Sequence, residues 1–244
     1  MNILLTNDDG YDSMYLTGLA SSLRFLGHKV TIVAPLRNKS AVSHSITLHK
    51  PISVTPKEAN VFAVDGTPVD CVYIALNAIM EEEPDLVISG INDGPNFGED
   101  IIYSGTVAAA REAFMKGYKS IAISKVYGNK LDMSKMFHLS AILLLKLAMY
   151  PLDTYFFNVN IPDIEDLEES YEFTDLSRRK WEEEVSMIAK QSKQTYYTIG
   201  GYEGNTGIKK GSDAYILNKG IVSVTPLTDI YTDLSFFDYI KKKL

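Results

Sequence analysis

The apolar run Ile3-Leu4-Leu5-Thr6, followed at once by Asn7-Asp8-Asp9-Gly10, sets the fold that we expect for this chain. A short apolar run that ends in a polar loop with glycine is typical of a buried strand. Leucines with helical spacing follow over 15–26, Gly27 ends that helix, and a second apolar strand covers 29–34. A strand, a helix and a strand in so short a segment form a βαβ unit, and its two strands are parallel.

Strands and helices keep alternating as far as residue 161. Further strands are expected over 86–89, 121–124 and 155–161, with weaker strand signals at 46–48, 52–54 and 61–64. Helices are expected at 67–80, around 106–113 and at 134–149. The first of these begins with the spacing of a capping box, formed by Thr67 and Asp70. The alternation predicts an α/β fold with a doubly wound, mostly parallel, Rossmann-like sheet.

Residues 162–244 differ in character from the part that precedes them. They begin with a charge-rich stretch, and later carry the signals of a β-hairpin through Tyr215–Leu217 and Ile221–Val224 and of a helix over Leu234–Lys242. No repeat and no low-complexity linker separates the two parts. We therefore expect a single domain over 1–244, with a core at 1–161 and a hairpin-and-helix extension at 162–244.

Composition excludes several classes of protein. Of the 244 residues, 31 are acidic and 24 basic, for a formal net charge of −7. Binding along a nucleic-acid polymer requires clustered cations, so we expect no such partner. One cysteine, Cys71, permits no disulfide framework. The N-terminus lacks the pattern of a signal peptide and no apolar run has the length of a membrane span, so we expect a cytoplasmic protein without a membrane partner.

Polar side chains follow three of the predicted strands. Asp8 and Asp9 follow the first strand, Ser40 comes shortly after the second, and Asn92 and Asn96 follow the third. Because the carboxyl ends of parallel strands meet at one edge of a sheet, we expect these side chains to converge on one crevice. Two adjacent carboxylates repel unless a cation or a proton relieves them. Oxygen donors suit Mg²⁺, Mn²⁺ or Ca²⁺ better than zinc, although the aspartates of an isolated motif of this kind also cap turns that face water.

The segment Ser104-Gly105-Thr106 begins an alanine-rich helix and follows a loop rich in Gly and Asn. A helix N-terminus offers free backbone N–H groups and a positive dipole end, which together favour a phosphate. The alternative is that Ser104 acts only as an N-cap.

Other catalytic motifs do not occur in the sequence. It has no Gly-x-Gly-x-x-Gly after the first strand, no Walker motif and no Gly-x-Ser-x-Gly elbow, which excludes the dinucleotide, P-loop and serine-hydrolase interpretations. His44 lies four residues beyond Ser40, so it is within reach of the crevice and we keep it as an accessory candidate.

Taken together, four ordered motifs resemble the SurE (survival protein E) family of metal-dependent acid phosphatases that act on nucleoside monophosphates. The motifs are Asn7-Asp8-Asp9-Gly10, Ser40 within the segment that starts at Pro35, Ser89 to Gly98, and Tyr103 to Ala110. The resemblance returns at Gly211-Ser212-Asp213 and over 220–227. Ala41 stands where the family usually has Gly, and Ser212 stands where it usually has Thr.

The resemblance implies one divalent cation per subunit, Mg²⁺ or Mn²⁺, held by Asp8, Asp9, Ser40 and Asn92. It implies a phosphate site formed by Asn96, Ser104, Gly105 and Thr106, with Asn7 as a further accessory candidate. It also implies a homodimer or a homotetramer in which part of the C-terminal region is exchanged between subunits.

The function that we expect is hydrolysis of nucleoside 5′- and 3′-monophosphates by a water that the cation activates. Asp8 and Asp9 are the expected catalytic residues, and one of them accepts a proton from the water or attacks directly. Two other interpretations stay open. A receiver-like, Mg²⁺-binding signalling module has similar paired aspartates but needs a further phospho-accepting aspartate where this chain has Asn92. A non-catalytic nucleotide-binding protein would have the same crevice without turnover.

Overall fold

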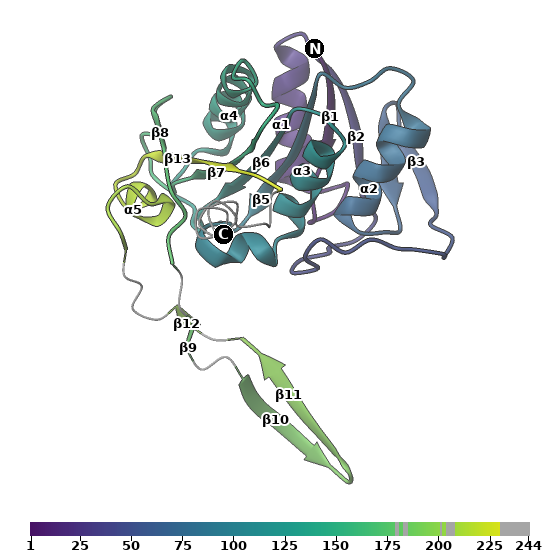
Figure 1. Ribbon diagram of the computed structural model, residues 1–244, viewed down its shortest axis with the longest axis vertical. Coiled ribbons are helices and arrows are strands. Elements are labelled where there is room, and N and C mark those ends of the chain that lie inside the picture. The colour runs from purple at the N-terminus through teal and green to yellow at the C-terminus, as the bar shows by residue number, and fades with distance from the viewer. Residues whose placement is uncertain (179–180, 183–184, 201, 204–207, 230–244) are drawn as a thin grey trace, which may run out of the picture.

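The computed structural model describes residues 1–178, 181–182, 185–200, 202–203 and 208–229. Its centre is a nine-stranded sheet (Figure 1). In spatial order the strands are β3 (Val54–Glu58), β4 (Val61–Val64), β2 (Lys29–Pro35), β1 (Asn2–Thr6), β5 (Leu86–Asp93), β6 (Ser120–Lys125), β7 (Phe156–Ile161), β13 (Val222–Leu227) and β8 (Tyr171–Phe173).

The six strands from β4 to β7 are parallel to one another, whereas β3 and β13 run antiparallel to their neighbours β4 and β7. Helices cover both faces of this sheet (Figure 1). Helices α1 (Met14–Phe25) and α4 (Met133–Leu147) pack on one face, and α2 (Pro68–Ile74) and α3 (Gly105–Met115) pack on the other. The predicted doubly wound, mostly parallel α/β fold is therefore confirmed.

Strand β1 shows why the sequence folds in this way. Ile3 and Leu5 point into the core beneath α1 and α4, while Leu4 joins the core beneath α2 and α3. All three side chains are fully buried, as expected for a central parallel strand with helices on both faces. Burial on both faces explains why this strand is a continuous apolar run rather than an alternating one.

The predicted helix starts agree with the structure. Thr67 and Asp70 form a capping box at α2, which continues through Ala75–Ile79 as a π-helical segment, η1. Ser104 caps α3, because its hydroxyl accepts a hydrogen bond from the backbone N–H of Val107 (3.1 Å). Cys71 is buried within α2. Among the described residues, no helix is long and apolar enough to cross a bilayer.

Two of the predictions for local structure are wrong. The expected hairpin at 215–224 is instead a short helix, α5 (Asp213–Leu217), followed by β13, which pairs with β7 and β8. Short apolar runs cannot be assigned to helix or strand by periodicity alone, and here the turn at Gly220 ends a helix. The expected strand at 46–48 is also absent, and the strand expected around 52–54 lies later in the chain, as β3, which begins at Val54. The helix expected over Leu234–Lys242 lies outside the described residues.

The observed hairpin lies in the extension and projects away from the sheet (Figure 1). It consists of β10 (Val185–Gln191) and β11 (Gln194–Ile199), which pair antiparallel. Short strands β9 (Trp181–Glu182) and β12 (Tyr202–Glu203) pair at its base. The remaining described elements are η2 (Gly98–Ile102), a 3₁₀ segment that precedes α3, and α5.

Gly90 allows β5 to change register against β6 just before the residues of the predicted site. The pairing of the two strands is interrupted between Ser89 and Asn92. Gly90 has φ +131°, and a Cβ atom there would lie 2.1 Å from the carbonyl oxygen of Ile123. Only a residue without a side chain fits at this close approach.

We therefore predict that Gly90→Ala lowers the free energy of unfolding by about 3 kcal/mol or more, because backbone strain and overlap with β6 add together. Gly27→Ala is the matched control, because Gly27 also has a positive φ (+85°) but no atom within 4 Å of the added Cβ. That variant should lose only about 1–2 kcal/mol. Urea unfolding of both variants checks this, and equal losses would contradict it.

Candidate metal and phosphate site

A cavity of about 200 Å³ lies at the carboxyl ends of β1 and β5, beside the loop that follows β2. Six of the predicted site residues line it, namely Asp8, Asp9, Ser40, Asn92, Asn96 and Ser104. Gly105, Thr106, Asn7 and His44 do not line it. The lining also includes residues to which the sequence analysis assigned no role in the site: Ala41, Asp93, Pro95, Asp100, Tyr103 and Tyr127.

Asp8 is buried between β1 and the N-terminus of α3. Its carboxylate accepts a hydrogen bond from the hydroxyl of Thr106, and only 4% of the residue is exposed. Burial is the main reason that the pKa of Asp8 is raised to about 6. The hydrogen bond from Thr106 lowers this pKa, and the neighbouring charge of Asp9 adds to the increase. A Cβ on Gly105 would lie 3.0 Å from the side chain of Asp8, so the glycine allows the helix to approach this closely. Thr106 therefore positions Asp8, a role that was not predicted for it.

Asp9 is held at the edge of the same cavity by two weak hydrogen bonds. Its carboxylate accepts one from the side-chain amide of Asn38 (3.3 Å) and one from the backbone N–H of Asp93 (3.4 Å). Asn38 also accepts a hydrogen bond from the hydroxyl of Ser40 (2.8 Å), so it links the two predicted ligands. Burial raises the pKa of Asp9 as well.

The loops that carry these ligands are tied together by the backbone. The N–H of Lys39 donates to the carbonyl of Asp8 (2.7 Å), which joins the loop after β2 to the loop after β1. Asn92 donates its amide N–H to the carbonyl of Gly94 (2.7 Å), and this fixes the side chain at the end of β5. The four predicted metal ligands thus come from the loops after β1 and β2 and from the end of β5, which converge at one edge of the sheet as the topology predicted.

Asn96 is held by a buried network that the sequence analysis missed. Its backbone N–H donates to Asn160 (2.8 Å), and its carbonyl accepts from Asn158 (2.7 Å) and Asn160 (2.9 Å). Its side-chain amide N–H donates a hydrogen bond to the hydroxyl of Ser124 (2.8 Å). Both asparagines of β7 are fully buried. The sequence did contain a signal for this network, namely two asparagines two residues apart in an otherwise apolar strand. Such residues lie on one face of the strand, and buried amides need hydrogen-bond partners because unpaired ones are costly.

The two accessory candidates have contacts outside the cavity lining. Asn7 forms two hydrogen bonds with the backbone of Gly10 (3.0 and 3.2 Å), so it shapes the loop that carries the aspartates. The ring Nε2 of His44 lies 2.9 Å from the carboxylate of Glu112 on α3. His44 therefore ties the loop beyond Ser40 to the helix rather than facing the cavity.

The cavity is strongly acidic. Four of its lining residues are aspartates (Asp8, Asp9, Asp93 and Asp100), and its described lining contains no Lys, Arg or His. The buried Lys125, outside the lining, pairs with Asp93 (2.9 Å). A phosphate would be repelled by such a cavity unless a cation neutralised it.

The donor set fits a hard divalent cation. Carboxylate, hydroxyl and amide oxygens are the ligands of Mg²⁺ and Mn²⁺. In the described part of the chain no three His, Cys, Asp or Glu side chains are grouped to hold a metal by themselves. The predicted set requires only two of these, because Ser40 and Asn92 supply the remaining oxygens.

The fold and the crevice define an α/β protein with a ligand site at the carboxyl ends of a doubly wound sheet. The model of the family described as Survival protein SurE matches residues 3–183. The chain therefore belongs to the SurE family.

Relatives of full length support this assignment. The chain is 40% identical to a 5′-nucleotidase SurE of Nitrosomonas eutropha, over 100% of this chain and 99% of the relative. It is 41% identical to a 5′-nucleotidase SurE of Geobacter sulfurreducens, over 93% and 87% of the two chains. The crystal structure of the SurE protein of Aquifex aeolicus superposes with a TM-score of 0.85 at 34% identity, covering 100% and 99% of the chains.

The raised pKa of Asp8 predicts how the stability of the metal-free protein depends on pH. The folded-state pKa, about 6, lies above the ordinary value of 3.8, so the folded protein binds this proton more tightly than the unfolded chain does. The resulting stability is full below about pH 4 and is lost as the pH rises through about 6, by up to about 3 kcal/mol.

Asp8→Asn removes this titration and keeps an acceptor for Thr106. In EDTA the variant should be more stable than the wild type at pH 7.5 and equally stable at pH 4. Urea unfolding at both pH values checks this, with the exposed Asp12→Asn as the control. A stability difference that is the same at both pH values would contradict the assignment.

Proposed function

We propose that this protein is a metal-dependent phosphomonoesterase that hydrolyses nucleoside 5′-monophosphates, and 3′-monophosphates as well, to nucleoside and phosphate. The observation that carries the proposal is the acidic cavity, in which Asp8, Asp9, Ser40 and Asn92 come together without a basic side chain in the described lining. Such a cavity suits a phosphate only together with a cation. Relatives that match 93% and 100% of this chain are named 5′-nucleotidases.

Asp8, Asp9, Ser40 and Asn92 would hold one Mg²⁺ or Mn²⁺ per subunit. When bound, the cation would polarise the phosphoryl group and lower the pKa of a water molecule. Asp8 is fixed by Thr106 and offers a charged oxygen from a buried position. The two adjacent carboxylates repel each other, and burial disfavours their charged forms. A bound cation would offset both of these costs, which favours its binding.

Asn96 and Ser104 would position the phosphoryl group, because both line the cavity and both are rigidly held. The hydroxyl of Ser124 can donate or accept, so the amide of Asn96 can turn its nitrogen toward a phosphate oxygen and remain hydrogen-bonded. Gly105 and Thr106 contribute the positive end of the α3 dipole, which already faces Asp8.

Asp9 is better placed than Asp8 to move a proton. It is less buried than Asp8, and its hydrogen bonds of 3.3 and 3.4 Å are long. We therefore assign to Asp9 the acceptance of a proton from the attacking water, while Asp8 stays hydrogen-bonded to Thr106.

The receiver-like alternative is less favoured, because the relatives match both the sheet and the extension. The second alternative, a non-catalytic nucleotide-binding protein, differs from the proposed nucleotidase only in that it releases no phosphate, so an activity assay distinguishes the two. The cytoplasmic location stays a prediction from the sequence.

We predict that the purified protein releases phosphate from AMP, that EDTA abolishes the release, and that Mn²⁺ or Mg²⁺ restores it. Asp8→Asn should lower kcat by more than roughly a hundredfold, since even changes to groups behind a ligand cost about 10–100-fold. Asp12→Asn, an exposed aspartate of the same loop outside the cavity lining, should keep wild-type activity. Circular dichroism verifies that both variants fold. Turnover that survives either EDTA or Asp8→Asn would contradict the metal assignment.

For the chain as a whole we propose one domain over 1–244, with the core at 1–161 and with 162–244 as an extension used in assembly. Strands β8 and β13 of the extension rejoin the main sheet, which supports a single domain. The hairpin β10–β11 supports the assembly. A two-stranded hairpin alone is marginally stable in water, so it needs a partner surface.

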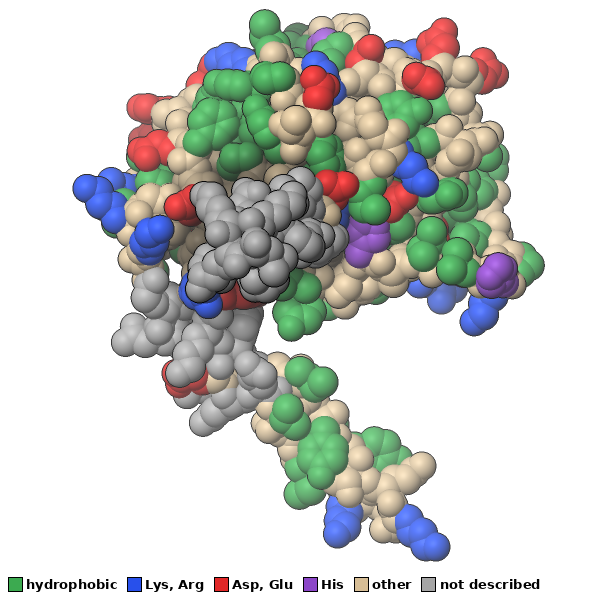
Figure 2. All heavy atoms as spheres, in the orientation of Figure 1, with side chains coloured by type: hydrophobic (Ala, Val, Ile, Leu, Met, Phe, Trp, Pro, Cys, Tyr) green, Lys and Arg blue, Asp and Glu red, His purple; other side chains and the backbone are tan. Residues whose placement is uncertain are grey.

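The two faces of this hairpin differ at the base, where β10 begins and β11 ends. The cross-strand pairs Val185–Ile199 and Met187–Tyr197 share one face, and all four side chains are more than 60% exposed. Between them, the pair Ser186–Thr198 lies on the other face. Figure 2 shows hydrophobic side chains along the projecting hairpin. We propose that the apolar face packs against a second copy of the chain, in a homodimer or a homotetramer with exchanged C-terminal segments.

The double variant Met187→Glu/Tyr197→Glu should therefore reduce the oligomer mass in solution, because two charges would have to be buried in the contact. The matched control Ser186→Glu/Thr198→Glu places the same charges on the opposite face, and its oligomer mass should be unchanged. Light scattering at several protein concentrations measures both. Equal behaviour of the two variants would contradict a contact through the apolar face.

A further inference from the structure

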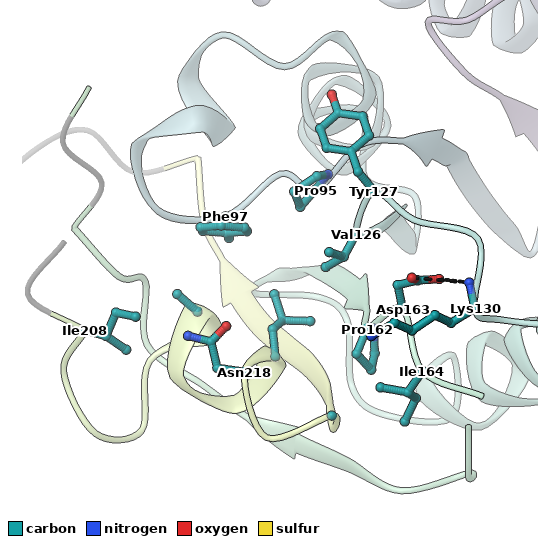
Figure 3. A pocket seen from close by; sticks show the side chains of 13 residues that line it. Pro95, Phe97, Val126, Tyr127, Lys130, Pro162, Asp163, Ile164, Ile208 and Asn218 are labelled. Atoms are coloured by element: carbon teal, nitrogen blue, oxygen red, sulfur yellow. Dashed lines mark hydrogen bonds between the residues drawn. The ribbon is translucent and has the colours of Figure 1, made fainter. Parts of the chain in front are cut away.

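A second cavity, of about 600 Å³, adjoins the acidic cavity. Pro95 and Tyr127 line both cavities, so these two side chains form the boundary between them. In Figure 3 they lie close together at one end of the larger cavity, and α5 lies at the other end. The larger cavity has the size of a small-molecule site, which is typically about 300–1,000 Å³.

The walls of the larger cavity differ in chemistry from those of the acidic one. Phe97, Val126 and Leu217 belong to one apolar cluster and form a continuous part of the wall. In the described lining, the charged residues are one acid and one base, Asp163 and Lys130. The backbone N–H of Lys130 donates a hydrogen bond to the carboxylate of Asp163 (3.0 Å). The larger cavity is therefore nearly neutral and has both apolar and polar walls, whereas the adjoining cavity contains four aspartates.

The backbone of the loop after β5 makes room for Tyr127 at the boundary between the two cavities. Gly94 has φ +147°, and a Cβ atom there would lie 2.4 Å from the hydroxyl oxygen of Tyr127. The glycine therefore leaves room for Tyr127 to lie across the loop that follows β5. Tyr127 is 70% exposed, so its ring is accessible to a ligand that passes from one cavity to the other.

A nucleoside monophosphate, like the pair of cavities, has one charged part and one neutral part. Its phosphate is charged and needs a cation in an acidic cavity, whereas its base is neutral, flat and suited to apolar walls. We propose that the larger cavity binds the nucleoside part of the substrate. The ribose passes Pro95 and Tyr127, and the base lies against Phe97, Val126 and Leu217. Asn218, exposed at the end of α5, offers an amide that can donate to and accept from the base edge. The assignment rests on the proposed nucleotidase function, because the phosphate must occupy the acidic cavity.

The test uses a substitution that fills the larger cavity without touching the acidic one. Asn218→Trp places a large ring in the cavity from an exposed position, where the fold tolerates it. Lys219→Trp is the matched control, because Lys219 is the next residue, is exposed and is not part of the lining.

Kinetics are measured for AMP and for glycerol 2-phosphate, a phosphate ester without a base. Asn218→Trp should raise the KM for AMP by roughly tenfold or more, the loss expected when a base no longer stacks on its wall. The kinetics of glycerol 2-phosphate and of the control should change less than about twofold.

A second measurement separates this proposal from the proposed function. Calorimetric binding of adenosine, which has no phosphate, should be detected with the wild type and the Lys219→Trp variant and lost in Asn218→Trp. If neither ester releases phosphate with any metal, the nucleotidase function fails, while this pattern of adenosine binding still supports the nucleoside site. Wild-type protein that does not bind adenosine, or equal changes for both esters in Asn218→Trp, overturns the site. Unchanged AMP kinetics with an altered oligomer mass also overturns it, since a second copy of the chain then covers the cavity.

Discussion

The burial of one carboxylate, that of Asp8, is the constraint on which the rest of the site depends. Its backbone belongs to the loop directly after the central strand β1, and its side chain meets Thr106 at the N-terminus of α3. The hydrogen bond and the helix dipole stabilise the charge in part, but burial still raises the pKa to about 6. A buried carboxylate with such a pKa, next to a second carboxylate, is a position at which a cation is bound favourably.

The rest of the structure holds other oxygen donors in place around this carboxylate. Asn38 links Asp9 to Ser40, and the change of register at Gly90 directs Asn92 to the same edge of the sheet. Behind Asn96, the buried asparagines of β7 hold its backbone from two sides. These contacts restrict the side chains of the site without taking part in chemistry, as a preorganised site requires. The acidic cavity and the neutral cavity then share a boundary, so one ligand with a charged end and an apolar end spans both.

Much of the fold and of the site was predictable because the signals were local. The βαβ unit, the capping box at Thr67 and the cap at Ser104 each depend on residues that are close in sequence. Convergence of the polar loops followed from topology, since parallel strands end at one edge. The hairpin predicted at 215–224 was wrong for the opposite reason. The apolar run at 215–217 satisfies either a helix or a strand, and its packing beside Phe97 and Val126 belongs to contacts far away in sequence.

The amino-acid sequence by itself determined the alternation of parallel strands and helices up to residue 161, the doubly wound sheet and the set of oxygen donors at its edge. These features follow from periodicity, capping and parallel pairing. Only the tertiary structure decided that Thr106 binds Asp8, that His44 binds Glu112 and that Asn158 and Asn160 hold Asn96. It also decided that one face of the projecting hairpin is apolar and that a neutral cavity adjoins the acidic one. The physical reason is that these features depend on side chains brought together from distant segments, whose distances and burial no local pattern encodes.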